Sequence, residues 1–317
     1  MNIAITGGTG FVGGHLAQSL TDKGHNVVLI ARGLDMRNES IRHLKSTQFK
    51  AIGTSDEKKL FDAFKGCDAI AHCAGINRES NPKDYTRIHI EGTQNVINAA
   101  KQAGVKKVIL ISFYSARPNC GSKYHESKYA AEEIVRNSGL DYTIFKPGMI
   151  YGKGDHMLDH LTHVFYTLPF FALVGFREQH AAPLAIDDFV KILEVSLLED
   201  RLSKKTLPVI GPEKMTLEEA VTRVAKVVDR TPIIFPMPIF FHYGFAVILE
   251  RLMTIPLVSI AQVRILAEGF DKSYGNYEQL PLDLQPQTTF TEAQIRKGLP
   301  ELGPFGLHDL KCWSKCQ

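Results

Sequence analysis

Residues 2–14 read NIAITGGTGFVGG, and this stretch decides the fold. A short apolar run, residues 2–6, leads directly into five glycines within the eight residues 7–14, and residues 11–23 then have the apolar spacing of a helix. Gly7, Gly10 and Gly13 therefore lie in a strand-to-helix turn with GxxGxxG spacing. Glycines there permit backbone angles closed to other residues, let main chain approach a pyrophosphate, and let helix and strand pack closely.

The turn favours a dinucleotide over a nucleoside triphosphate, because it lacks the Gly-Lys-Ser/Thr ending of a P-loop. A bound anion would meet the helix N-terminus, with its free N–H groups and favourable dipole. A glycine-rich turn without a ligand is the alternative interpretation. The position between a strand and a helix, more than the glycine pattern itself, argues against that alternative.

Further runs rich in Val, Ile and Ala follow, separated by helical patterns, at residues 26–31, 49–52, 68–73, 107–112 and 142–146. Near-continuous apolar runs are typical of strands covered on both faces, which implies a parallel sheet with helices on each side. We therefore predict an α/β fold. It consists of a Rossmann-type doubly wound parallel sheet with a smaller, mostly helical C-terminal substrate lobe.

The composition changes after Lys146-Pro-Gly, where residues 164–176 and 232–249 are strongly apolar and carry Pro or Gly. We predict a dinucleotide-binding domain over 1–152, with 181–229 returning to it, and a substrate lobe over 153–180 and 230–317. Residues 232–249 are expected to form lobe core, with docking on a membrane surface as the alternative. A membrane-spanning helix is not expected there, because prolines interrupt the stretch.

The net charge of +3 arises from 37 basic and 34 acidic residues, without a long basic tract. No nucleic-acid partner is therefore expected. The five cysteines are odd in number and lack metal-type pairing, and Met1 leads into a strand rather than a secretory signal, so a reducing cytoplasm is expected.

Metal binding is not expected either. A redox or metal pair at Cys312 and Cys316 is the alternative, but it has no nearby His and is not a CxxC. Asp155-His156 and Asp187-Asp188 lack further ligands, so turn and helix-cap roles are predicted for them.

The glycine stretch resembles the TGxxGxxG fingerprint of extended and atypical short-chain dehydrogenases/reductases. Further matches occur in the order of that family, at His72-Cys-Ala-Gly75, Glu91-Gly-Thr93, Tyr124-His-Glu-Ser-Lys128 and Lys146-Pro-Gly-Met-Ile-Tyr-Gly152. Residues 146–155, 184–189 and 255–266 resemble an atypical branch that includes the dehydrogenase-like accessory subunit of respiratory complex I.

This resemblance implies a nicotinamide cofactor held by residues at the ends of several strands. Those residues are Gly7, Thr9, Gly10, Phe11, Val12, Gly13, Arg32, Ala74, Gly75, Tyr124, Lys128 and Pro147. Arg32 ends the second apolar run, where a guanidinium suits the 2′-phosphate of NADP and an acid would suit NAD. NADP is expected, NAD is the alternative cofactor, and a solvated surface arginine is the other interpretation of Arg32.

The adenine side of the site departs from the family. Where relatives commonly carry Asp after the third strand, this chain has Gly53-Thr54-Ser55-Asp56. Both Thr54 and Asp56 are candidates for the missing contact.

Tyr124 and Lys128 are four residues apart in a helical pattern over residues 123–137, which places both on one face. A nearby ammonium favours the phenolate, so the spacing predicts an acid/base tyrosine. In the resembling family this Tyr exchanges the substrate proton and the Lys holds the nicotinamide ribose. An ordinary solvated helix is the alternative.

A hydroxyl after the fifth strand should hold the reacting oxygen, and Ser112, Tyr114 and Ser115 compete for this role. Ser112 is chosen, with Ser115 second, and a serine that caps its own turn is the alternative. His89 replaces an Asn that relays protons in many relatives. It is either a hydrogen-bonding substitute or a satisfied core histidine.

We predict an NAD(P)-dependent oxidoreductase or epimerase/dehydratase-type enzyme that acts on a small molecule, either apolar or a sugar nucleotide. The strongly apolar composition of the second lobe favours the apolar substrate. The alternative function is a non-catalytic NADP(H)-binding structural, assembly or redox-sensing protein. The sequence leaves the oligomeric state open.

Overall fold

The computed structural model describes residues 1–33, 39–199, 201–253, 256–269 and 272–306. They form two compact units. The first contains Met1–Pro147, Ile186–Val209 and Ser273–Pro286, and the second contains Gly148–Ala185, Ile210–Lys272 and the described residues from Gln287 on. The first unit thus takes residues 186–209 rather than all of 181–229, and adds 273–286. The domain boundaries drawn from the sequence stay predictions.

The first unit is built on a seven-stranded parallel sheet in the order β11-β6-β5-β4-β1-β2-β3. Its strands are β1 (Asn2–Thr6), β2 (Asn26–Ala31), β3 (Thr47–Ala51), β4 (Ala69–His72), β5 (Lys107–Ile111), β6 (Asp141–Pro147) and β11 (Lys205–Val209). The chain reverses its direction across the sheet between β1 and β4. The carboxyl ends of these two strands therefore mark the topological switch point, where ligands of such folds bind.

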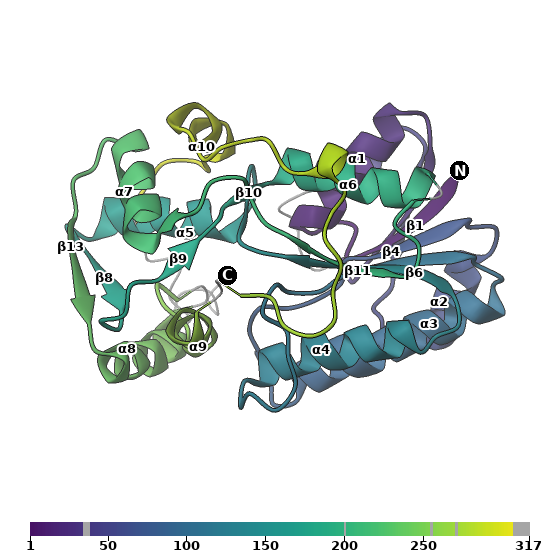
Figure 1. Cartoon of the computed structure of the whole chain (residues 1–317), viewed down its shortest axis with the longest axis horizontal. Helices are drawn as coiled ribbons and strands as arrows, with labels where there is room; N and C mark the ends of the chain where they lie inside the picture. The colour runs from purple at the N-terminus through teal and green to yellow at the C-terminus, as the bar shows by residue number, and fades with distance from the viewer. Residues whose placement is uncertain (34–38, 200, 254–255, 270–271, 307–317) are drawn as a thin grey trace. The chain divides into compact units, whose positions relative to one another are not determined.

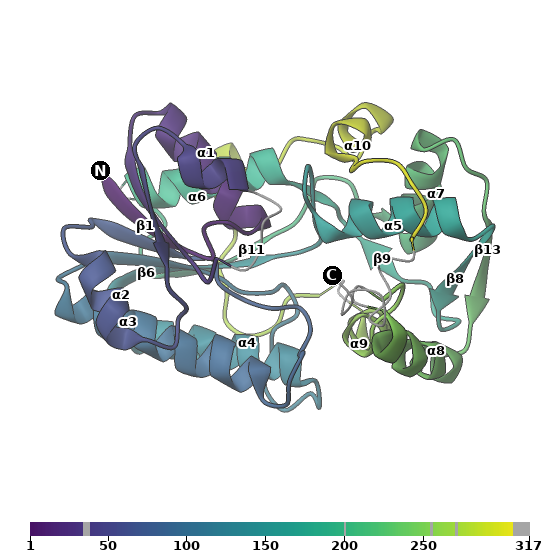
Figure 2. The same ribbon diagram turned by 180° about the vertical axis from the view of Figure 1, so that it is seen from behind.

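Helices cover both faces of this sheet, as Figures 1 and 2 show. One face carries α1 (Phe11–Asp22) and α6 (Ile186–Leu198), and the other carries α2 (Glu57–Phe64), α3 (Gly92–Gln102) and α4 (Lys123–Arg136). Two short 3₁₀ turns, Glu39–His43 and Leu282–Leu284, and one π-helical turn, Thr86–Glu91, complete the unit. The predicted Rossmann-type doubly wound sheet is confirmed.

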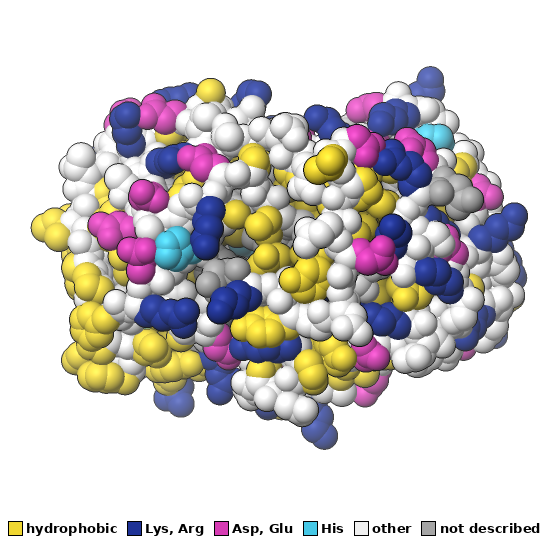
Figure 3. Space-filling model, viewed as in Figure 1, with side chains coloured by type: hydrophobic (Ala, Val, Ile, Leu, Met, Phe, Trp, Pro, Cys, Tyr) yellow, Lys and Arg dark blue, Asp and Glu magenta, His cyan; other side chains and the backbone are white. Residues whose placement is uncertain are grey.

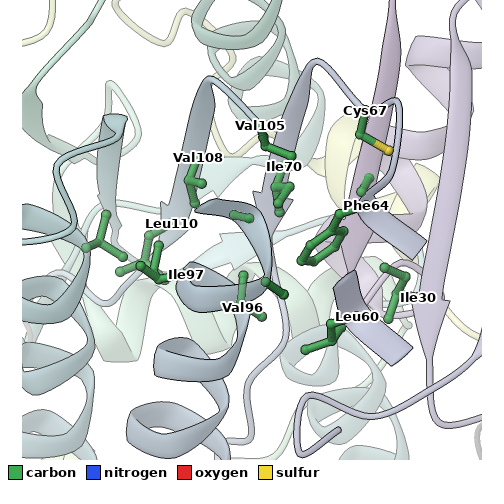
Figure 4. Packing of buried hydrophobic residues seen from close by; sticks show 14 of the residues in the cluster. Ile30, Leu60, Phe64, Cys67, Ile70, Val96, Ile97, Val105, Val108 and Leu110 are labelled. Carbon is green, nitrogen blue, oxygen red and sulfur yellow. The ribbon is translucent and has the colours of Figure 1, made fainter. Parts of the chain in front are cut away.

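An apolar core lies between the sheet and the helices α2, α3 and α4 (Figure 4). Leu60 and Phe64 of α2 and Val96 of α3 are fully buried there, against strand residues that include Ile70 and Val108. Close packing of this kind resists deformation. It therefore fixes the carboxyl edge of the sheet, from which the candidate site is built.

The second unit is mostly helical, as predicted. Its helices are α5 (His156–Thr167), α7 (Leu217–Val227), α8 (Ile239–Leu252), α9 (Ile260–Glu268) and α10 (Glu292–Gly298). Its strands pair in twos, β7 (Ile150–Tyr151) with β10 (Leu184–Ala185), β8 (Phe170–Val174) with β13 (Ile233–Met237), and β9 (His180–Ala181) with β12 (Met215–Thr216). Side-chain caps begin α5, α7 and α9, at Asp155, Thr216 and Ser259.

The prediction that residues 232–249 form lobe core is wrong for most of the stretch. Within α8 only His242 and Ala246 are buried, and Phe240 is 67% exposed. An apolar side chain is not necessarily an interior one. None of the described helices is both long enough and apolar enough to cross a membrane.

Candidate functional site

The glycine turn joins β1 to α1 with very little space around it. Gly7 has a φ of +68°, in the left-handed region that favours glycine. A Cβ on Gly13 would lie 2.4 Å from the carbonyl oxygen of Gly7, which is closer than atoms can approach. The predicted glycine roles at Gly7 and Gly13, backbone freedom and close helix packing, follow from this geometry.

The N-terminus of α1 is open to an anion. Its N-cap is Gly10, which has no side chain to cap the first N–H groups, and the first turn carries no acidic residue. Phe11 and Val12 begin this turn and Thr9 precedes it, as predicted. The positive end of the helix dipole is therefore uncompensated by this helix's own first turn.

The turn also contacts the segment that follows β4. A Cβ on Gly7 would lie 2.8 Å from the backbone nitrogen of Ala74, and a Cβ on Gly75 would lie 3.0 Å from the Lys128 Nζ. The glycine turn, the loop after β4 and α4 thus meet at the switch point. Any side chain at these two glycines would fill the space between them.

A buried histidine ties the carboxyl ends of β1 and β4 to α3. Thr93 donates its hydroxyl to the His89 carbonyl, at 2.5 Å, so its oxygen accepts from His72 Nε2, at 3.0 Å. The Nδ1 of His72 then accepts from the Thr6 hydroxyl at 2.6 Å. Burial, followed by repulsion from Lys128, lowers the pKa of His72 to about 3 and keeps it neutral.

His89 holds the loop after β4. Ser127 donates its hydroxyl to the Tyr124 carbonyl, so its oxygen accepts from His89 Nδ1 at 2.8 Å. The Nε2 of His89 accepts the backbone N–H of Ile76 at 3.1 Å. Burial is the main cause that lowers the pKa of His89, to about 2. His89 is thus a satisfied buried histidine, and Ser127 is a partner that the sequence did not reveal.

Lys128 is buried on α4 and directed to the end of β5. Its Nζ donates to the carbonyl of Ile111 at 3.2 Å. Burial lowers its pKa to about 8, against the opposing effects of Cys73 and Glu132. An ammonium that titrates this close to neutral pH is unusual and is found mainly at functional sites.

Tyr124 is buried among aromatic rings. Its neighbours are Tyr85, His89, Phe113 and His125, with ring centroids 5.3–5.9 Å from its own. Its phenol donates to Asn77 Oδ1 at 3.4 Å. Burial and Tyr85 raise its pKa above the usual range. The predicted lowering by a nearby ammonium is therefore wrong, because the desolvation of the phenolate dominates.

Ser112 is placed differently from the prediction. Its hydroxyl donates to the buried Glu132 carboxylate at 2.5 Å, and its oxygen is thus oriented into the protein by α4. Glu132 also binds Arg136 and Lys146, at 2.7 and 3.3 Å. The structure therefore gives Ser112 a structural partner, and the second choice, Ser115, is buried as well.

Arg32 lies exposed at the end of β2, where its stem passes Gly53. Of the two candidates on the adenine side, Asp56 caps α2 by accepting the N–H of Lys59 at 3.0 Å. Thr54 packs against α3, where a Cβ on Gly92 would lie 2.5 Å from its hydroxyl oxygen. Glycine in the Glu91-Gly-Thr93 match thus allows α3 to approach this loop.

Pro147 is buried at the end of β6, and its carbonyl accepts the N–H of Tyr114 at 2.9 Å. Burial raises the pKa of the Cys73 thiol to about 12, which suits a packing residue rather than a reactive thiol. Asp155 accepts N–H groups of Gly152, Met157 and Leu158, as predicted for a helix cap. The Cys312 and Cys316 pair lies outside the described residues.

Comparisons with known proteins agree with this geometry. The model of an NAD(P)H-binding family matches residues 7–161. The mitochondrial NADH-ubiquinone oxidoreductase 40 kDa subunit of Neurospora crassa is 26% identical over 235 residues, which cover 71% of this chain and 59% of that one. The ceramide reductase of Caulobacter vibrioides is 30% identical over 155 residues, covering 48% and 47%.

Among solved structures, the UDP-glucuronic acid 4-epimerase of Bacillus cereus, in complex with UDP-glucuronic acid and NAD, superposes with a TM-score of 0.70. The match covers 94% of this chain and 97% of that one at 18% identity, so it shows the fold alone. The chain spans between about a quarter and two thirds of the length of the curated relatives that it matches.

Proposed function

Since this chain belongs to the NAD(P)-binding superfamily of extended and atypical short-chain dehydrogenases/reductases, and resembles the complex I branch within it, we propose that it is an NADP(H)-dependent oxidoreductase or epimerase/dehydratase-type enzyme. One observation carries the proposal. The glycine turn, the loop after β4 and the Lys128 ammonium lie in contact at the switch point of the sheet.

The residues present fit a nicotinamide dinucleotide. Gly7, Gly10 and Gly13 leave room for a diphosphate at the uncapped start of α1, and Arg32 offers a guanidinium at the end of β2. Ala74, Gly75 and Pro147 would line the remainder of the site. When bound, the cofactor supplies or accepts a hydride.

In the proposed reaction Tyr124 exchanges the proton of the substrate oxygen. Its raised pKa keeps the phenol protonated at neutral pH, which suits proton donation to a carbonyl oxygen as the carbonyl is reduced. Lys128 would hold the nicotinamide ribose, as in the resembling family. Ser112 was chosen from the sequence to bind the reacting oxygen, and its hydroxyl donates to Glu132; Ser115 stays the second choice for that role.

Turnover tests the proposal. Purified protein should oxidise NADPH with a quinone or an apolar ketone, or, with the oxidised cofactor, should dehydrogenate or epimerise a UDP-sugar. Calorimetry in parallel should register binding of NADPH. The proposal fails if the cofactor binds and none of these substrates is turned over.

A second function is supported by a specific observation. The phenol of Tyr124 is deeply buried and donates to Asn77, and Ser112 is bonded to Glu132, so both hydroxyls chosen as catalytic already have protein partners. A non-catalytic, NADP(H)-binding structural, assembly or redox-sensing role accounts for this arrangement. Binding of NADPH without turnover is the result that would favour it.

Arg32 determines the preference for NADP in this proposal. Replacing Arg32 with Ala should weaken NADPH binding about 10- to 100-fold, because a charge-assisted bond to phosphate contributes roughly 1.5–3 kcal/mol. Binding of NADH should change little. Calorimetric titration measures both affinities, and Arg264→Ala, an exposed arginine of the second unit, is the control. Equal losses for NADPH and NADH would refute the assignment.

The titration of Lys128 should appear in the affinity for the cofactor. An anionic ligand raises the pKa of a contacting ammonium, so affinity should be constant below about pH 8 and should fall by up to about tenfold per pH unit above it. Lys128→Met should remove this dependence. Lys123→Met, an exposed lysine of the same helix, should retain it. A fall of the same steepness in Lys128→Met would show that another group titrates.

A further inference from the structure

The outward half of α8 is apolar apart from Arg251. At 100° per residue, Phe241, Phe245, Ile248 and Leu252 occupy one sector about 60° wide, and Phe240 and Val247 lie about 80–100° beyond one edge of it. These side chains are 41–67% exposed. The inward side includes the buried His242 and Ala246, and the apolar stripe of a helix normally faces the protein interior. The apolar side chains of the outward half of α8 are therefore exposed, although such side chains are typical of a protein interior.

Exposed side chains of β8 and β13 extend this surface. Ile233 pairs with Phe170 across the two strands, and Phe235 lies two residues on, so all three share one face. Their exposed fractions are 70%, 43% and 38%. Phe176, 74% exposed, lies near the start of α8, since a Cβ on the preceding Gly175 would lie 3.3 Å from Ile239. We call these residues and the outward half of α8 the α8 face. Figure 3 shows hydrophobic side chains gathered over α8, at the lower left.

This segment carries a small excess of positive charge. Between residues 230 and 253 the bases are Arg230 and Arg251, both exposed, and the one acid is Glu250. The Glu250 carboxylate accepts the N–H of Ile260 at 3.0 Å. By its helical position Arg251 lies within the outward half of α8. The α8 face therefore combines large aromatic and aliphatic side chains with an exposed arginine, Arg251.

We propose that the α8 face docks on the surface of an anionic lipid bilayer, with α8 lying in the plane of the headgroups. Aromatic and aliphatic side chains next to arginines suit the boundary between acyl chains and headgroups. At about 1.5 Å per residue α8 is about 21 Å long, shorter than the roughly 30 Å of the hydrocarbon core, so it lies on the bilayer. This proposal is independent of the proposed function.

Vesicle flotation of the full chain tests the proposal. We expect wild-type protein to float with vesicles of phosphatidylcholine and phosphatidylglycerol in equal parts, and to float less with phosphatidylcholine alone. Added salt should reduce the difference between them, because it screens the headgroup charge. Wild-type protein that stays unbound with both kinds of vesicle would overturn the proposal.

Variants locate the contact. The double substitution Phe245→Glu with Ile248→Glu should lower partitioning at least about tenfold, since it places two charges in the apolar surface. Leu282→Glu is the matched control, because Leu282 is 91% exposed in the first unit, and it should float as the wild type does. Arg251→Glu gives a second test that leaves the apolar surface intact, and it should lower binding only to vesicles that contain phosphatidylglycerol. Equal flotation of all these variants would contradict the assignment.

Two controls complete the test. Circular dichroism should show that each variant is folded, and calorimetry should show unchanged NADPH binding. Light scattering without vesicles tests whether a second copy of this chain covers the α8 face instead. A wild-type dimer that dissociates in the double variant would show that a second copy covers the α8 face, and this result would also overturn the proposal.

Discussion

Replacing Tyr124 with Phe is expected to lower turnover about 10²- to 10⁴-fold, the usual contribution of a general acid or base. The substitution removes the one atom that can exchange a proton. It keeps the ring, which packs beside Phe113 and Tyr85 with centroids 5.3 and 5.6 Å away. The affinity for NADPH should stay within about twofold, because the lost interaction is one made in the transition state. Steady-state NADPH oxidation and calorimetric titration measure the two quantities.

The matched control is Tyr85→Phe, which removes a phenol hydroxyl from the neighbouring buried ring. Tyr85 donates to the Asn77 carbonyl at 3.0 Å and stacks on His89. If Tyr124 is the acid, Tyr85→Phe should retain most of the activity. Equal losses in both variants would instead indicate that the aromatic cluster supports the site as a whole, and full activity in Tyr124→Phe would remove Tyr124 from the mechanism.

Much of the fold could be predicted because its signals are local. The strands β1 and β2 have the predicted bounds, and the glycine turn lies between β1 and α1 as expected. Apolar runs covered on both faces identify parallel strands without knowledge of their neighbours. The same logic fails for α8, because the sequence shows that a segment is apolar but not which side of it the rest of the protein covers.

The site was predicted less well, for a related reason. The four-residue spacing placed Tyr124 and Lys128 correctly on one helix. Their pKa values, however, depend on burial by other elements of the fold. Burial raises the pKa of the phenol and lowers that of the ammonium. The orientation of Ser112 depends likewise on Glu132, 20 residues away in the chain and without a motif to mark it.

Glu132 is the residue whose removal should cost the most stability. Its side chain is fully buried and contacts two cations, Arg136 at 2.7 Å and Lys146 at 3.3 Å. The Lys146 Nζ also donates to the carbonyls of Ala116 and Tyr274, at 2.9 Å each. Glu132 thereby helps to hold α4, the loop after β5 and residues 273–286 together within the first unit.

We expect Glu132→Ala to lower the free energy of unfolding by about 3–5 kcal/mol, because it leaves the buried Lys146 ammonium without its counter-charge. Urea unfolding followed by circular dichroism measures the loss. Glu133→Ala is the adjacent control, since its carboxylate is 43% exposed and it also pairs with Arg136, and it should cost at most about 1 kcal/mol. Equal losses in the two variants would contradict the assignment.

The pH dependence of Glu132→Ala should identify the charge as the cause. Burial lowers the pKa of Lys146, and Glu132 opposes that effect in the wild type. In the variant, Lys146 has a lower pKa in the folded state than in the unfolded chain. Between these two pKa values the unfolded state binds more protons, so the free energy of unfolding rises with pH. Adding Lys146→Met should restore much of the loss, because no buried charge then remains unpaired. A loss that is independent of pH and persists in the double variant would instead reflect the cavity left by the side chain.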